Sequence, residues 1–131
     1  MIVVDTNVIA YFCTGGMYGE AAIKLAVEEP EWRAPPLWIS EFRNFLLGKI
    51  RRDGMALADA LTAMSKARRR LGARFDTVST SAVLELSRSG CTAYDLEFVA
   101  LAQELRAPLY TMDRQVLTAF PGLAFPLMPE S

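Results

Sequence analysis

The sequence predicts a single α/β domain, residues 1–131, built around a mainly parallel sheet. Short apolar segments with strand character alternate along the whole chain with longer segments whose apolar residues recur at helical spacing. The length of 131 residues is that of one ordinary domain, and a hydrophobic content of 52% is enough for a core. The sequence contains no repeat, linker or low-complexity stretch that would divide it.

The expected elements follow from these patterns and from the glycines and prolines between them. Strands are expected at residues 1–5, 31–34, 74–78, 109–111 and 123–125. Helical segments are expected at residues 6–12, 18–29, 37–52, 56–71, 81–88, 93–106 and 113–120. Thr80 and Thr92 are expected to cap two of these helices. Gly54 and Gly72 end the two central ones, which form a helical hairpin.

The absence of histidine excludes several classes of site. With a His count of 0, the chain has no Ser-His-Asp triad, no Cys-His dyad, no His-His ribonuclease site and no histidine-ligated zinc. Cys13 and Cys91 are isolated, which fits small apolar residues in a reducing compartment and does not make a Cys-rich zinc site. If the protein is a hydrolase, its chemistry depends on carboxylates, most simply together with a metal ion.

Charge and hydropathy predict a cytoplasmic protein without a membrane segment. No apolar run approaches the roughly 20 residues that cross a bilayer, and the N-terminus lacks the positive region of a signal peptide. A net charge of −1 provides no general attraction to nucleic acid. Basic residues do gather at the ends of the hairpin helices, at positions 49–52 and 66–74. They are either solvated helix ends, favoured by the helix dipole, or contacts for a polyanion.

Four acids stand where an α/β sheet would gather them. Asp5 follows the first strand, Asp113 follows the strand at 109–111, and Asp95 lies in the first turn of a helix. Ligands of open α/β sheets bind at the carboxyl edge of the strands. Glu41 lies on the flank of the apolar stripe of its helix, where a charged group needs a partner. Together they predict a pocket of oxygen ligands suited to a hard divalent cation.

Each acid also has an ordinary structural explanation. Asp5 and Asp113 are at positions suited to helix N-caps, and Glu41 is explained equally well as a salt-bridged or snorkelling side chain. Asp95 fits a capping box with Thr92. It shares the apolar face of its helix, whereas Glu97 is expected to face water.

A cluster of these acids is unstable without a counter-charge. Two carboxylates about 4 Å apart repel each other by roughly 1 kcal/mol in water and by about 4 kcal/mol at an effective dielectric constant of 20. Either some of the carboxylates take up protons or a cation binds. At neutral pH a divalent ion is the simpler solution.

Four segments resemble the PIN-domain nucleases, and among them the VapC-type toxins of type II toxin–antitoxin pairs. The matching segments are Ile2-Val3-Val4-Asp5-Thr6-Asn7-Val8-Ile9, Ser40-Glu41-Phe42-Arg43-Asn44, Thr92-Ala93-Tyr94-Asp95 running into Val99-Ala100-Leu101-Ala102, and Leu109-Tyr110-Thr111-Met112-Asp113. The segments occur in the family's order and span nearly the whole chain, so the ordered set is more specific than any one motif.

This resemblance implies a three-layer α/β/α fold and a ribonuclease activity that depends on Mg²⁺ or Mn²⁺. It places the catalytic, metal-binding acids at Asp5, Glu41, Asp95 and Asp113, and supporting polar groups at Asn7 and Thr111. It also implies an RNA substrate, a cognate antitoxin protein and a homodimer. The antitoxin is expected to lie along the helices at residues 37–52 and 56–71, where apolar residues are plentiful.

The expected chemistry is metal-assisted hydrolysis of a phosphodiester bond. Asp5 and Asp95 are the expected direct ligands, Asp113 serves a second ion or acts through water, and Glu41 binds through water or orients the nucleophile. RNA contacts are expected from Arg43, Arg114 and the two basic helix ends.

Three other functions are alternatives to a metal-dependent ribonuclease. A haloacid-dehalogenase-type phosphatase needs Asp-x-Asp after the first strand, but the third position here is Asn7. A receiver domain needs adjacent acids after that strand and a phospho-accepting Asp after the third strand, and neither is visible. A catalytically inactive PIN-like binding module stays open as the alternative.

Overall fold

A computed structural model describes residues 1–129, which contain a four-stranded, fully parallel sheet with the strand order β2-β1-β3-β4. The strands are β1 (Ile2–Val4), β2 (Trp32–Arg33), β3 (Leu109–Tyr110) and β4 (Ala124–Phe125). Val3 of the central strand pairs with Arg33 on one side and with Leu109 on the other. The predicted α/β class with a parallel sheet is therefore confirmed.

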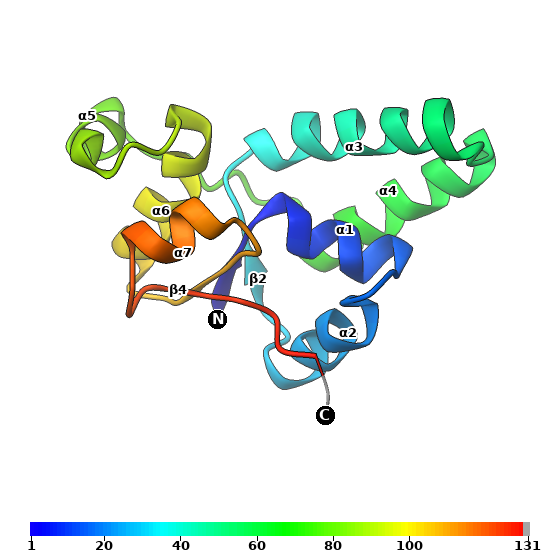
Figure 1. Ribbon diagram of the computed structural model, residues 1–131, viewed down its shortest axis with the longest axis horizontal. Coiled ribbons are helices and arrows are strands. Elements are labelled where there is room, and N and C mark those ends of the chain that lie inside the picture. Colours follow the sequence, from blue (N-terminus) through cyan, green and yellow to red (C-terminus); the bar gives the residue numbers. More distant parts are fainter. Residues whose placement is uncertain (130–131) are drawn as a thin grey trace.

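Helices cover both faces of the sheet, which makes the three layers of the predicted fold (Figure 1). The helices are α1 (Thr6–Thr14), α2 (Gly19–Glu28), α3 (Leu37–Asp53), α4 (Leu57–Leu71), α5 (Thr80–Leu84), α6 (Ala93–Leu105) and α7 (Arg114–Ala119), with a short 3₁₀ helix at Ser87–Ser89. On one face α6 packs against β1 and β3. On the other, α1 packs against α2, α3 and α4.

The core lies on both sides of β1, whose three residues are fully buried. The apolar stripe of α3 faces this core as predicted, because Trp38, Phe42 and Leu46 are buried. Phe45 is half-buried at the edge of the stripe and stacks on Phe42, with ring centroids 5.9 Å apart. The α3–α4 hairpin extends beyond the sheet, and Gly54 provides its left-handed turn with a φ of 69°.

The strand expected at residues 74–78 is absent, so that prediction was wrong. Phe75 is 74% exposed, and the segment pairs with no strand in the sheet of residues 1–129. Side chains hold it instead: the Arg33 guanidinium binds the Asp76 carboxylate through two contacts, one of them 2.9 Å from Nε to Oδ2. An ion pair with the edge strand β2, rather than a ladder of backbone hydrogen bonds, therefore holds this segment.

The helix expected at residues 81–88 is also different. Ser79, not Thr80, is its N-cap, and its hydroxyl accepts a hydrogen bond from the Ala82 N–H at 3.1 Å. The α-helix ends at Leu84 and the chain continues through a turn into the 3₁₀ helix. Three consecutive hydroxyl residues at 79–81 are all acceptable caps, so the sequence does not select one of them.

No helix within residues 1–129 is both long and apolar enough to span a bilayer.

Candidate functional site

Asp5 lies at the carboxyl edge of the sheet, at the end of its central strand. Its N–H donates to the Tyr110 carbonyl of β3 at 2.9 Å, so it is the last residue held by the β1–β3 ladder. It is also the N-cap of α1, and its side chain is only 7% exposed. The predicted strand-end position and the helix-cap alternative therefore hold together.

Both carboxylate oxygens of Asp5 accept hydrogen bonds. The Thr6 N–H donates to Oδ1 at 2.7 Å, and the Thr111 hydroxyl donates to Oδ2, also at 2.7 Å. The Asn7 amide nitrogen lies 3.5 Å from the same Oδ2. Asn7 and the fully buried Thr111, the polar residues named from the family resemblance, thus both contact this carboxylate.

Glu41 approaches from α3 and is positioned by Thr6. The Thr6 hydroxyl donates to Glu41 Oε1 at 2.7 Å, so Thr6 serves one acid with its backbone and another with its side chain. Sequence reasoning did not select Thr6 as a site residue. Its only signal was its place directly after Asp5 at a strand end.

Asp113 and Asp95 stand at the starts of α7 and α6. Asp113 caps α7, because its Oδ1 accepts the N–H groups of Gln115 and Val116 at 2.9 and 3.1 Å. The Asp95 N–H donates to Thr92 Oγ1 at 3.2 Å, which confirms Thr92 as the N-cap. Asp113 and Asp95 therefore belong to helix-capping motifs and also lie at the candidate site.

The loop that carries Asp113 is tied to α1. The Met112 N–H donates to Asn7 Oδ1 at 3.1 Å, and the Asp113 N–H donates to Thr111 Oγ1 at 3.0 Å. Thr111 therefore links Asp5 and Asp113 through one hydroxyl, which donates to the first and accepts from the backbone of the second.

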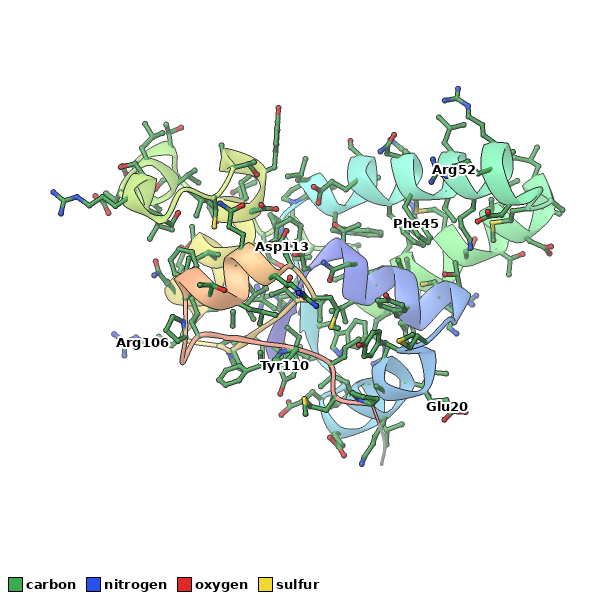
Figure 2. The ribbon with its side chains drawn as sticks, viewed as in Figure 1. Glu20, Phe45, Arg52, Arg106, Tyr110 and Asp113 are labelled. Carbon is green, nitrogen blue, oxygen red and sulfur yellow. The ribbon has the colours of Figure 1, made fainter. Side chains whose placement is uncertain are left out.

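All four predicted acids line a single cavity of about 700 Å³. The cavity extends from the carboxyl edge of the sheet along α3. Asp113 lies near the sheet, and Phe45 and then Arg52 follow along α3 (Figure 2). Further polar lining residues are Thr6, Asn7, Ser40, Asn44, Arg51 and Tyr94. Arg43 and Arg114, which were expected to contact RNA, are exposed but are not among its lining residues.

The acids share an unfavourable electrostatic environment. Burial raises the pKa of Asp5 from 3.8 to about 6, and the charges of Glu41 and Asp95 add to this rise against the hydrogen bonds from Thr111 and Thr6. Burial, with the nearby charge of Asp113, also raises the pKa of Asp95. For Glu41 the causes of a raised pKa are burial and the charges of Asp95 and Glu97. Burial and mutual repulsion thus disfavour the charged forms of Asp5, Glu41 and Asp95.

Glu97 is less exposed than the sequence predicts. It is half-buried against residues of α5 such as Val83 and Leu84, and burial raises its pKa. The helical wheel placed Glu97 opposite the core, but α5 covers that side of α6. The charge of Glu97 contributes to the raised pKa of Glu41, although Glu97 does not line the cavity that contains the four acids.

The side chains fit a hard divalent cation by their chemistry, although they do not form a closed coordination shell. Within residues 1–129 no three Asp, Glu, Cys or His side chains converge closely enough to hold a metal as they stand. Mg²⁺ keeps several of its waters and is usually bound through one or two carboxylates, so it does not need such a cage. The acids offer oxygen ligands only, and burial together with mutual repulsion raises the pKa values of Asp5, Glu41 and Asp95, whose charged forms a cation would favour.

The raised pKa of Asp5 predicts a pH-dependent stability of the metal-free protein. Asp5 binds its proton more tightly in the folded state (pKa about 6) than at its ordinary value of 3.8. The free energy of unfolding therefore falls as pH rises from about 4 to about 6, by roughly 2–3 kcal/mol, and stays reduced above that range. Asp5→Asn removes this loss, so its stability relative to the parent increases over the same window.

Urea unfolding of both proteins in a chelator, from pH 4 to pH 8, measures this difference. The loss of one acceptor oxygen in the variant adds an offset that does not vary with pH. A stability difference that is flat across the whole range contradicts the assignment of this titration to Asp5.

Comparisons with known proteins agree with this architecture. The crystal structure of PAE2754 from Pyrobaculum aerophilum has the same fold, with a TM-score of 0.77 and 20% sequence identity over 96% of this chain and 83% of that one. No curated protein sequence matches the chain. The PIN domain model matches residues 2–122, and members of that family are typically nucleases that depend on divalent metals. The chain belongs to the PIN domain family.

Proposed function

We propose that this PIN domain is a Mg²⁺- or Mn²⁺-dependent endoribonuclease, the VapC-type toxin of a type II toxin–antitoxin pair, acting as a cytoplasmic homodimer. The observation that carries the nuclease proposal is the shared cavity. Four acids from four separate segments of the chain line it, and it lies at the carboxyl edge of a parallel sheet.

The acids would hold the cation with different roles. Asp5 and Asp95 are the proposed direct ligands, and Asp113 and Glu41 complete the negative environment. When bound, a divalent cation lowers the pKa of water and stabilises charge on the phosphate oxygens. The other polar residues fix the carboxylates in place: Thr111 orients Asp5, and Thr6 orients Glu41.

Glu41 is the acid best suited to interact with a water molecule. It is half-buried and its carboxylate accepts one hydrogen bond, from Thr6, so further lone pairs face the cavity. Its raised pKa brings it closer to the working range of a general base than an ordinary glutamate. We assign to it the orientation of the attacking water.

A catalytically inactive PIN-like binding module is the second candidate. The observation in its favour is that no ready three-ligand metal cluster exists within residues 1–129. The two candidates differ in one property, because only the nuclease cleaves RNA in a reaction that a chelator stops.

Replacing the proposed ligands tests the nuclease. Asp5→Asn and Asp95→Asn are each expected to reduce Mg²⁺-dependent cleavage of single-stranded RNA by at least about 100-fold, because each removes a charged ligand from the site. Rates are measured on purified protein with Mg²⁺, Mn²⁺ or EDTA.

Glu104→Gln is the matched control, since Glu104 is an exposed acid of α6 outside the cavity, and it should cleave like the parent. Glu97→Gln is unsuitable as a silent control because its charge acts on Glu41. Full activity in both ligand variants, or cleavage that persists in EDTA, would exclude the proposed mechanism.

Only some of the apolar residues of the α3–α4 hairpin are exposed, and these define the surface that we propose for the antitoxin. Trp32, Trp38 and Phe42 are buried and belong to the core, so they are not available to a partner. The hairpin instead exposes Leu57 and Leu61 on α4, at 65% and 60%, and Leu47 on α3, at 41%. Leu47 also lines the cavity. An apolar helix or strand of the antitoxin on this hairpin would place an Arg or Lys beside the acids, where it would compete with the cation.

Hydrogen exchange on the free protein and on its complex with the cognate antitoxin tests that placement. Protection is expected on α3, on α4 and around the four acids, because the partner covers amides that are otherwise open to solvent. Protection confined to surfaces remote from residues 37–71 and from the acids would refute it.

A further inference from the structure

Gly48 occupies an unusual place in the middle of α3. Glycine is unfavourable in a helix interior, because it loses more conformational freedom on folding than any other residue. Yet Gly48 is buried, and the group that covers it is the guanidinium of Arg52. A Cβ at position 48 would overlap Nη2 of Arg52 and would lie only 2.9 Å from its Cζ. The missing side chain therefore leaves the space in which the Arg52 guanidinium lies.

Helix geometry directs this guanidinium back along α3. Residues four apart are neighbours on one face, and helical side chains lean toward the N-terminus. Arg52 therefore reaches over Gly48 in the direction of Glu41, and both Gly48 and Arg52 line the cavity that contains the acids. Arg52 follows Glu41 by eleven positions, which corresponds to about 16 Å along the helix axis. The positive and negative groups are thus at opposite ends of the same cavity, too far apart to pair.

The charge of Arg52 is not paired with any other group of residues 1–129. Within the part of the chain that the structure describes, neither Arg51 nor Arg52 has a hydrogen-bond or ion-pair partner. The neighbouring Lys49 does have one, since it pairs with Asp53 at 3.2 Å.

The basic end of α4 contrasts with that of α3. Lys66 donates to the Phe12 carbonyl at 3.1 Å and lies over the Phe12 ring, and Arg70 donates to the Pro30 carbonyl at 2.9 Å. The basic end of α4 thus includes two cations, Lys66 and Arg70, that hold the fold together. The basic end of α3 includes two unpaired cations, Arg51 and Arg52, that line the cavity.

We propose that Arg52, held over Gly48 with Arg51 beside it, binds a backbone phosphate of single-stranded RNA, on a nucleotide away from the bond to be cleaved. This inference rests on the proposed ribonuclease function and adds the path of the substrate along α3. A guanidinium suits the task because it can bind a phosphate through two parallel hydrogen bonds. The rings of Phe45 and Tyr94 line the same cavity and provide faces for bases to stack on.

Binding without catalysis tests the proposal. A fluorescently labelled, mixed-sequence single-stranded RNA is titrated with protein in EDTA, over a series of salt concentrations, and anisotropy is recorded. Arg52→Ala is expected to weaken binding about tenfold at low salt, because it removes a charge-assisted contact. Loss of one phosphate contact should also reduce the magnitude of the slope of log K against log salt by about 0.7.

Gly48→Ala tests the same contact without removing any charge. The new methyl displaces the guanidinium, which is the far end of a flexible side chain, so binding should weaken while thermal stability stays the same or rises. Arg52→Lys keeps the charge but lacks the planar fork, and we expect intermediate affinity. Arg88→Ala is the matched control, since Arg88 is an exposed arginine of the 3₁₀ helix at Ser87–Ser89 that does not line the cavity and was not expected to contact RNA.

The outcomes separate this inference from the proposed function. Parent-like binding by Arg52→Ala overturns it, as does an equal loss in Arg88→Ala, which would indicate a general charge effect. Parent-like binding by Gly48→Ala overturns the role of the glycine. Because binding is measured without metal, a parent protein that binds RNA through Arg52 and fails to cleave it would overturn the nuclease and leave the phosphate contact standing.

Discussion

The buried carboxylate of Asp5 organises the functional end of this molecule. One of its oxygens receives the first N–H of α1 and the other receives the hydroxyl of Thr111, so the central strand, α1 and the loop after β3 meet at one side chain. Thr6 extends the connection to Glu41 on α3. These hydrogen bonds lower the pKa of Asp5, and yet burial and neighbouring charges raise it to about 6. The fold therefore keeps an acid where it is electrostatically unfavourable, which is typical of a site built to bind a cation.

Helix α3 places a negative and a positive side chain at opposite ends of the candidate site. It carries Glu41 in its second turn and Arg52 in its last, and the cavity extends between them. The net charge of −1 does not reveal this arrangement. Positive and negative residues cancel in the total, although they lie at different places in the structure. Such a distribution suits a polyanionic chain whose backbone is held at one end of a cavity and reaches the clustered acids at the other. The absence of a side chain at Gly48 leaves the space that the Arg52 guanidinium occupies, so packing contributes to the position of Arg52.

Much of the fold and of the candidate site could be predicted from the sequence, because the local sequence patterns agree with the global fold. Buried strands next to amphipathic helices specified the parallel sheet, and strand ends located Asp5 and Asp113. The failures have physical causes that act between segments. Residues 74–78 include strand-favouring residues such as Phe75 and Val78, but a side-chain ion pair between Arg33 and Asp76 holds the segment instead. Glu97 lies on the outer face of its own helix, yet α5 covers it.

The hydrogen bond from Thr6 to Glu41 joins residues 35 positions apart, and no local pattern marks it. The Gly48–Arg52 contact is local, but a glycine four residues before an arginine carries no signal until the cavity is known. Single-sequence reasoning thus located the carboxylates, and the family resemblance named Asn7 and Thr111, but Thr6 and Gly48 were missed.

The central claim is that the clustered acids bind a divalent cation and that their repulsion is the reason. Thermal unfolding at pH 7.5, with increasing Mg²⁺, tests it on the parent and on the Asp5→Asn/Asp95→Asn double variant. A ligand that binds only the folded state raises stability by mass action, by about 2.7 kcal/mol at a hundred times its Kd. The account predicts that Mg²⁺ raises the Tm of the parent and barely moves that of the double variant, which starts higher in EDTA. Equal shifts in the two proteins would contradict it.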